Sequence, residues 1–279
     1  MLPILLPNCT GGARPSYSRL VEVIDLSAPI VSSPEGTPDV LRTDIDFQDH
    51  SEGARVIEEL FGVGPELLRD GEGWANEFFT RFGTHNSTHV DAPWHYNSEV
   101  DGERAGTIET LPLEWFVQPG VVLDFSDRED GEAVTGDDIG AALDKIGHEL
   151  SPLEIVLIRT GCDRWIDSPE YMAHGPGVTA QATRWMFDRG VRVMGIDAWG
   201  WDRPLWMQAE EAKRTGNKGV FWEAHQADLP YSQIERMVNL DSLPPTGFTV
   251  SCLPLPIVGA SAAPARVVAI LDDALETPE

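Results

Sequence analysis

The middle of the chain alternates between short apolar runs and amphipathic segments. Each apolar run is bounded by glycine or charged residues, which predicts a buried strand. The runs are residues 120–125, 154–160 and 191–197. Between them, apolar positions at helical spacing predict one helix that begins after Thr135 and another over Ala180–Arg189, capped by Thr179. Strand–helix–strand alternation predicts an α/β fold with some parallel strands.

The flanking regions add further elements to this core. Strands are expected at residues 21–26, 248–253 and 266–271, and helices at 51–68 (broken by two glycines), 108–115 and 232–240. Residues 1–20 are rich in proline, glycine and serine and predict an extended arm, and residues 272–279 predict a fraying acidic tail. Since no repeat or linker divides the rest, residues 21–271 are expected to form one domain with a mixed β-sheet core and flanking helices.

The charge balance excludes two classes of partner. Lys and Arg total 20 against 46 Asp and Glu, for a formal net charge of −26 over 279 residues. Such a surface repels nucleic-acid phosphates and anionic membranes, so we expect neither as a partner. The hydrophobic content of 42% is ordinary for a globular protein.

Cysteine usage and hydropathy indicate the cellular compartment in which the protein is expected. Cys9, Cys162 and Cys252 are odd in number and far apart, which provides neither a disulfide framework nor a Cys-x-x-Cys metal pair. The apolar N-terminal heptapeptide is short, lacks a basic flank and does not match a signal peptide. Apolar runs also fall short of the roughly 18 residues of a transmembrane helix. We therefore expect a cytoplasmic protein.

Three histidines and an aspartate crowd into residues 81–95. His85 and His89 are four residues apart, which places two imidazoles on one side of a helical turn or tight loop. Asp91 follows His89 by two residues, the spacing that places two side chains on the same face of an extended segment. His95 lies beyond a proline, which would interrupt a helix. Imidazole and carboxylate suit zinc or manganese, so the segment predicts a metal site. The alternative is a polar surface loop with ordinary hydrogen bonds.

Bulky aromatic residues lie close to this segment. Trp74, Phe78 and Phe79 precede it and Trp94 lies within it. Such residues either fill the core or wall a substrate pocket. We take Trp74, Phe78 and Trp94 as candidates for contact with an aromatic or flat cyclic substrate.

The histidine segment also resembles a known signature. From His85 to His95 it reads His-Asn-Ser-Thr-His-Val-Asp-Ala-Pro-Trp-His, similar to the pattern His-x-Gly-Thr-His-x-Asp-x-Pro-x-His of the metal-dependent cyclase family. That family includes bacterial kynurenine formamidases, isatin hydrolases and a trans-dienelactone hydrolase. Further landmarks, such as Gly195-Ile-Asp197 and the segment 264–270, extend the resemblance over residues 20–271. Ser87 replaces the family glycine, and its side chain restricts the turn.

The resemblance implies a fold, a site and a cofactor. The fold would be the family's swivelling β/β/α arrangement, and one or two divalent ions, zinc or manganese, would be bound. His85, His89 and Asp91 would ligate the first ion, and His95 would be a second-metal ligand or catalytic base. A distant histidine and acid are best matched by His225 and Glu235, with Glu223 as the alternative acid. The loop containing His174 would lie near the active site and contact substrate.

The reaction that fits these residues is metal-assisted hydrolysis of a small cyclic amide or lactone, or of an aryl formamide. His95, His225 or Glu235 could transfer the proton. Two alternatives remain: a lyase or cyclase that stabilises an enolate with the same metal, and a non-catalytic ligand-binding member of the fold. By resemblance, we expect a homodimer or homotetramer that acts on a small molecule.

Overall fold

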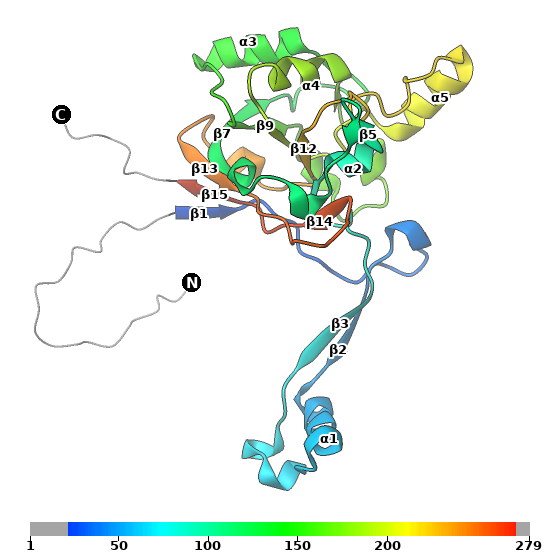
Figure 1. Ribbon diagram of the computed structural model, residues 1–279, viewed down its shortest axis with the longest axis vertical. Helices are drawn as coiled ribbons and strands as arrows, with labels where there is room; N and C mark the ends of the chain where they lie inside the picture. The colour runs from blue at the N-terminus through cyan, green and yellow to red at the C-terminus, as the bar shows by residue number, and fades with distance from the viewer. Residues whose placement is uncertain (1–21, 272–279) are drawn as a thin grey trace, which may run out of the picture.

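A nine-stranded mixed sheet forms the centre of the computed structural model, which describes residues 22–271 (Figure 1). The predicted arm at 1–20 and the predicted tail at 272–279 lie outside the described residues. In spatial order the strands are β1 (Glu22–Asp25), β15 (Val268–Leu271), β13 (Phe248–Ser251), β7 (Val117–Asp124), β9 (Ile155–Arg159), β11 (Val193–Ile196), β12 (Ser232–Glu235), β4 (His89–Asp91) and β14 (Ala262–Pro264).

The four central strands run parallel, and the outer strands pair antiparallel. β7, β9, β11 and β12 form successive parallel pairs. Residues 155–158 are an unbroken apolar run with every side chain buried, as expected for a strand covered on both faces. The predicted α/β class and the predicted strands at 120–125, 154–160 and 191–197 are therefore confirmed.

Side-chain alternation along the strands divides the core between the two faces of the sheet. Val156 and Ile158 pack in a cluster with residues of α3 (Gly136–Ile146) and α4 (Ala180–Phe187). Ile155 and Leu157 belong to a second cluster, built with side chains of β4, β12 and β13. Figure 1 shows α3 and α4 together over one face of the sheet. The second cluster also contains Leu26, Val267 and Ala269, from near the two ends of the described chain.

Both predicted central helices begin at the expected caps. The Thr135 side chain accepts from the backbone N–H of Asp138, and the Asp138 side chain accepts from Thr135 in return, which forms a capping box. Gly147 ends α3 in the left-handed conformation at φ 66°. Thr179 caps α4 through the N–H of Ala182. The structure adds α5 (Leu205–Thr215), which sequence analysis did not predict.

Residues 44–81 form a long hairpin arm that extends away from the sheet (Figure 1). Its strands are β2 (Asp44–Gln48) and β3 (Asn76–Arg81), and α1 (His50–Phe61) lies at its far end. α1 accounts for the first part of the helical region expected over residues 51–68, and Gly62 ends it. The arm exposes several large apolar side chains: Phe47, Leu60, Phe61, Leu67, Trp74, Phe78 and Phe79.

Short elements complete the chain. The expected loop after residue 96 contains a small hairpin, and the expected helix at 108–115 divides into two 3-10 turns. The remaining helix is α2 (Pro93–Tyr96), and the remaining strands are β5 (Glu99–Val100), β6 (Glu103–Arg104), β8 (Ala133–Val134) and β10 (Gly177–Val178). The 3-10 turns are Asp39–Leu41, Pro65–Leu67, Arg69–Gly71, Ile108–Thr110, Leu113–Phe116, Cys162–Trp165, Tyr171–Ala173 and Leu240–Ser242. No helix within residues 22–271 is long and apolar enough to cross a membrane.

The prediction of a helix over residues 232–240 is wrong. Ser232–Glu235 is instead strand β12, buried between β11 and β4, and the chain then turns away from the sheet. Both Ser232 and Gln233 are fully buried although they are polar. In so short a segment, apolar spacing does not distinguish a buried strand from a helix, and tertiary pairing decides the outcome.

The central strand β9 supplies a test of this core. Leu157 is 0% exposed, so Leu157→Ala removes buried methyl groups and leaves a cavity. We expect the free energy of unfolding to fall by about 2–5 kcal/mol in urea denaturation. Leu113→Ala is the matched control, because that side chain is 70% exposed, and its effect is expected within about 0.5 kcal/mol. Equal effects of the two substitutions would contradict the packing described above.

Candidate metal centre

The sheet register brings the histidine segment beside a distant acid. β4 carries His89 and Asp91, and it pairs antiparallel with β12 so that His89 is opposite Glu235. Directly opposed residues of antiparallel strands project to the same face, so the two side chains approach each other. His85 lies in the turn before β4, and His95 in α2 just after it. Three secondary-structure elements and one turn therefore surround a single point.

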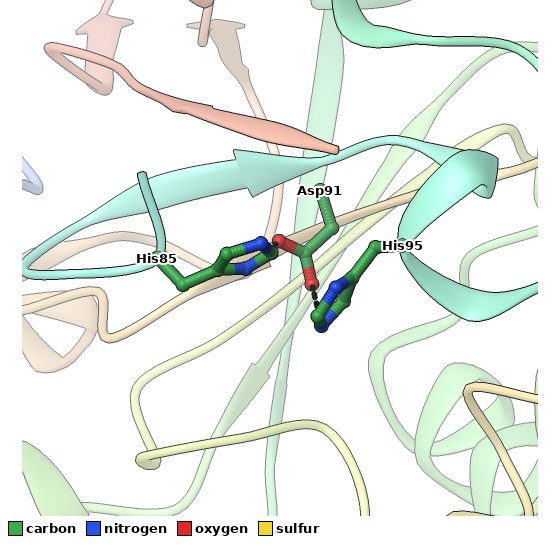
Figure 2. A group of neighbouring side chains, drawn as sticks. All are labelled: His85, Asp91 and His95. Carbon is green, nitrogen blue, oxygen red and sulfur yellow. Dashed lines mark ion pairs between the residues drawn. The ribbon is translucent and has the colours of Figure 1, made fainter. Parts of the chain in front are cut away.

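Asp91 is the centre of this group. Its Oδ1 lies 2.9 Å from His85 Nδ1 and 3.2 Å from His89 Nε2, and its Oδ2 lies 3.9 Å from His95 Nε2. Figure 2 shows the Asp91 carboxylate between the rings of His85 and His95. Donor atoms of His85, Asp91 and His95 all lie within 4.8 Å of one another, as do those of His89, Asp91 and Glu235. The two groups share Asp91.

His225 joins the same cluster from the loop before β12. Its Nε2 lies 3.3 Å from Glu235 Oε1 and 3.9 Å from Asp91 Oδ2. All six residues that the resemblance assigned to the centre thus lie together. The alternative acid, Glu223, belongs to neither donor group.

Burial gives this cluster an unusual electrostatic character. His89 and Asp91 are 0% exposed, and Glu235 is 5% exposed. Within the described chain, His89 Nε2 and both carboxylate oxygens of Asp91 are buried without a hydrogen-bond partner. Buried polar atoms are ordinarily paired, because leaving them unpaired costs free energy. A divalent cation coordinated by these atoms would satisfy them, and imidazole with carboxylate is a donor set that suits zinc or manganese.

Neighbouring groups fix the orientation of the histidine rings. His89 Nδ1 contacts Ser87 O at 3.0 Å, which directs Nε2 toward Asp91 and Glu235. His85 Nε2 contacts Ser261 Oγ at 3.0 Å. Such outer contacts set the tautomer of a ligating histidine.

Ser87 takes the turn that a glycine would favour. Its φ is 58°, in the left-handed region, and its hydroxyl donates to Ala28 O at 3.1 Å. His85 still faces Asp91, so the serine keeps the geometry of the turn at some conformational cost.

Asp202 is the residue at this site whose role sequence analysis missed. Its Oδ2 accepts from both the backbone N–H and Nδ1 of His225, at 3.1 and 2.5 Å, and its Oδ1 accepts from Ala224 N at 3.0 Å. The side chain holds the His225 ring with Nε2 directed at Glu235. No motif spacing marks a contact between residues 23 positions apart.

The surroundings shift the pKa values of His95 and His225 in opposite directions. Burial lowers the pKa of His95 to about 4, although Asp91 opposes the shift. At neutral pH His95 therefore has a free nitrogen lone pair, which either a ligand or a base requires. Burial also opposes the charged form of His225, yet hydrogen bonds to Asp202 and Glu235 raise its pKa to about 10. Coulombic attraction to the histidines holds the pKa of Asp91 well below its usual range despite burial.

The cluster opens onto a cavity of about 390 Å³. His85, His95, His225 and Glu235 line one part of it. Aromatic and aliphatic side chains form much of the remaining wall: Val40, Leu41, Met172, Trp199, Leu205, Phe221 and Trp222. A small planar molecule would fit against these rings with its reactive group at the histidines.

Of the four predicted substrate-contact residues, only His174 lines this cavity. Its Nδ1 lies 2.8 Å from Asp130 Oδ2, and its ring stacks on Trp165 at 4.3 Å. Trp74 and Phe78 lie on the hairpin arm, where the Trp74 ring packs against Phe61. Trp94 packs under the guanidinium of Arg104. The expectation that Trp74, Phe78 and Trp94 wall the pocket is therefore not met within one chain, because backbone direction carries them elsewhere.

Known proteins are similar to this chain in sequence and in fold. A family model described as "Cyclase: Putative cyclase" matches residues 24–203. Isatin hydrolase from Roseibium aggregatum is 26% identical over 204 residues, which cover 69% of this chain and 73% of that protein. Kynurenine formamidase from Salinibacter ruber is 31% identical over 201 residues, which cover 70% and 78%.

Solved structures agree with these relatives. The structure of isatin hydrolase A from Ralstonia solanacearum is similar with a TM-score of 0.68 at 25% identity, over 90% of this chain and 92% of that chain. An isatin hydrolase bound to the product analogue thioisatinate has a TM-score of 0.66 at 23% identity, over 90% of this chain and 92% of that chain. At this low identity the similarity shows the fold alone. Because the family match spans more than half of the residues and contains most of the centre, the chain belongs to the cyclase family.

Proposed function

We propose that this protein is a metal-dependent hydrolase that opens a small cyclic amide or lactone, or cleaves an aryl formamide. The observation that carries the proposal is the buried cluster around Asp91, whose unpaired donor atoms lie beside an aromatic-walled cavity. The relatives named isatin hydrolase and kynurenine formamidase support the same reaction class.

The six clustered residues divide between holding the cation and moving protons. We assign His85, His89 and Asp91 to the first divalent ion, zinc or manganese, His95 to a second ion or to proton transfer, and His225 and Glu235 to proton transfer. A bound ion would polarise the scissile carbonyl and make water nucleophilic near neutral pH. His95 Nε2 is suited to accept a proton, because burial keeps the imidazole neutral at pH 7. Asp202 keeps His225 Nε2 directed into the centre throughout.

The cavity wall favours an aromatic or flat cyclic substrate. Trp222 meets the ring of His225 in a stacked arrangement at 4.6 Å and that of His95 edge-on at 5.0 Å. A planar ring placed in this cavity would contact the wall through its faces, while its carbonyl reached the histidine cluster. These contacts would orient the scissile bond and exclude water from the non-reacting side.

We also propose that the chain assembles as a homodimer or homotetramer through the hairpin arm. A two-stranded hairpin is marginal by itself in water, and this one exposes Phe47 by 68% and Phe79 by 54%. An exposed apolar patch of this kind is typical of an interaction site. Trp74 and Phe78 would reach a substrate only across such an interface. The buried, unpaired Cys162 and Cys252 support the further proposal of a cytoplasmic, reducing setting.

Metal analysis tests the assignment of ligands. We expect His89→Ala to lose bound metal and activity together. Removing a residue that only hydrogen-bonds a metal ligand lowers metal affinity or activity by roughly 10- to 100-fold, and the loss in His89→Ala should be larger. His148→Ala is the control, because that histidine pairs with Glu154 at 2.9 Å outside the centre and should keep full metal content. Full metal occupancy in His89→Ala, measured by elemental analysis, would refute the assignment.

Turnover in labelled water tests the reaction class. The metal-loaded protein is offered N-formylkynurenine, isatin and a dienelactone in ¹⁸O-water. Hydrolysis must place one solvent oxygen in the new carboxylate, and we expect that label in the product by mass spectrometry. An unlabelled product would indicate a lyase or cyclase instead, and absence of turnover across the panel would favour a binding protein.

Sedimentation tests the assembly. The double substitution of Phe78 and Phe79 by serine removes apolar surface from the arm. We therefore expect the protein concentration below which the oligomer dissociates to be at least about tenfold higher than for wild type. Leu113→Ser changes a 70% exposed residue outside the arm and should leave the mass distribution as in wild type. A wild-type protein that sediments as a monomer at all concentrations would disprove the proposal.

A further inference from the structure

Arg236 occupies an unusual position on the cavity wall. It follows Glu235 directly, and both residues line the cavity. Consecutive residues of a strand normally project to opposite faces. Here β12 ends at Glu235 and Arg236 has φ 58°, in the left-handed region, so the alternation is broken at this step.

Hydrogen bonds on both sides fix this backbone conformation. The Arg236 N–H donates to Ala198 O at 3.1 Å, and Thr88 Oγ1 donates to Arg236 O at 2.6 Å. Glycine adopts a positive φ freely, whereas a side chain there costs free energy. The arginine side chain is therefore carried into the cavity at a conformational cost.

The guanidinium of Arg236 is held in place by Trp199. Its Cζ lies 4.7 Å from the centre of the indole ring, and its Nε donates to Trp199 O at 3.3 Å. Stacking on an aromatic face and one hydrogen bond along the edge leave the two terminal nitrogens as a preorganised fork.

This fork makes no salt bridge with any acid in residues 22–271. Two arginines line the cavity, and the other, Arg203, pairs with Glu211 at 3.1 Å. The two acids on the wall are also engaged, since Asp202 and Glu235 both bind His225. Arg236 thus has no direct ion-pair partner among residues 22–271, although the full sequence carries a net charge of −26 and Glu235 and Asp91 attract the guanidinium from a longer distance. A partly buried, unpaired cation is costly unless an anion meets it.

We infer that Arg236 binds a carboxylate carried by the substrate, at a position away from the bond that is hydrolysed. This inference rests on the proposed function and narrows it to anionic aryl amides, aryl formamides or lactones. Two carboxylate oxygens match the two terminal guanidinium nitrogens, and such bidentate pairs give both affinity and orientation. Glu235, one residue earlier, faces the histidine cluster, so the chain would hold the anion and the reacting centre from adjacent residues.

Paired substrates test this role. Two N-formylanilines are compared that differ only in a ring substituent, a carboxylate in one and a neutral carboxamide in the other. We expect wild type to prefer the carboxylate through a lower KM, and Arg236→Gly to reduce that preference by about 10- to 100-fold. Glycine suits the left-handed backbone, so this variant should fold, and Arg236→Lys should retain part of the preference.

Matched controls separate the possible outcomes. Arg203→Met removes the cavity cation that is already paired and should leave the preference as in wild type. If Arg236→Gly lowers kcat/KM equally for both substrates, the inference is wrong, because the residue then acts on the backbone or on the shared formyl group. An unchanged preference would also overturn it.

A binding measurement keeps this inference separate from the proposed hydrolysis. If wild type turns over neither substrate, the proposed function fails for this class. Calorimetry with benzoate and benzamide on the metal-loaded protein still tests Arg236. Benzoate should bind wild type more tightly than benzamide, and Arg236→Gly should lose that difference. Benzoate affinity that Arg236→Gly leaves intact would place the anion elsewhere and refute the inference.

Discussion

The burial of two carboxylates among four histidines is the constraint on which this structure depends. Asp91 and Glu235 lie on neighbouring strands and are 0% and 5% exposed, and neither carboxylate oxygen of Asp91 has a hydrogen-bond partner in the described chain. Isolated buried charges of this kind would be strongly unfavourable. The sheet imposes them, because the pairing of β4 with β12 places both acids on one face. A cation-binding role is the arrangement that removes this cost.

Around this centre the fold separates rigid from adaptable parts. His89, Asp91 and Glu235 lie on paired strands of the sheet, where main-chain pairing fixes their positions. The aromatic wall comes from the segments after β11 and before β12, which are loops and α5. Binding pockets commonly combine a rigid scaffold with variable loops.

Sequence reasoning named most of the residues that cluster around Asp91 and much of the fold, for reasons that differ between residues. The spacing of His85, His89, Asp91 and His95 is local, so it could be interpreted without tertiary knowledge. His225 and Glu235 required the family resemblance, since nothing nearby marks them. The contact of Asp202 with His225 and the position of Arg236 on the cavity wall were missed, because they depend on ring orientation and on a positive φ. Trp74 and Phe78 were misplaced because aromatic content does not reveal the direction in which a hairpin extends.

The pairing of His89 with Glu235 has a consequence for the order of events during synthesis. A growing chain would contain the entire histidine segment long before the strand that completes the centre is translated. Until β12 has left the ribosome and inserted beside β4, the donor set lacks its second acid, and long-range pairing of this kind forms slowly. Metal acquisition is thereby linked to completion of the sheet, so nascent or truncated chains would compete poorly for the ion.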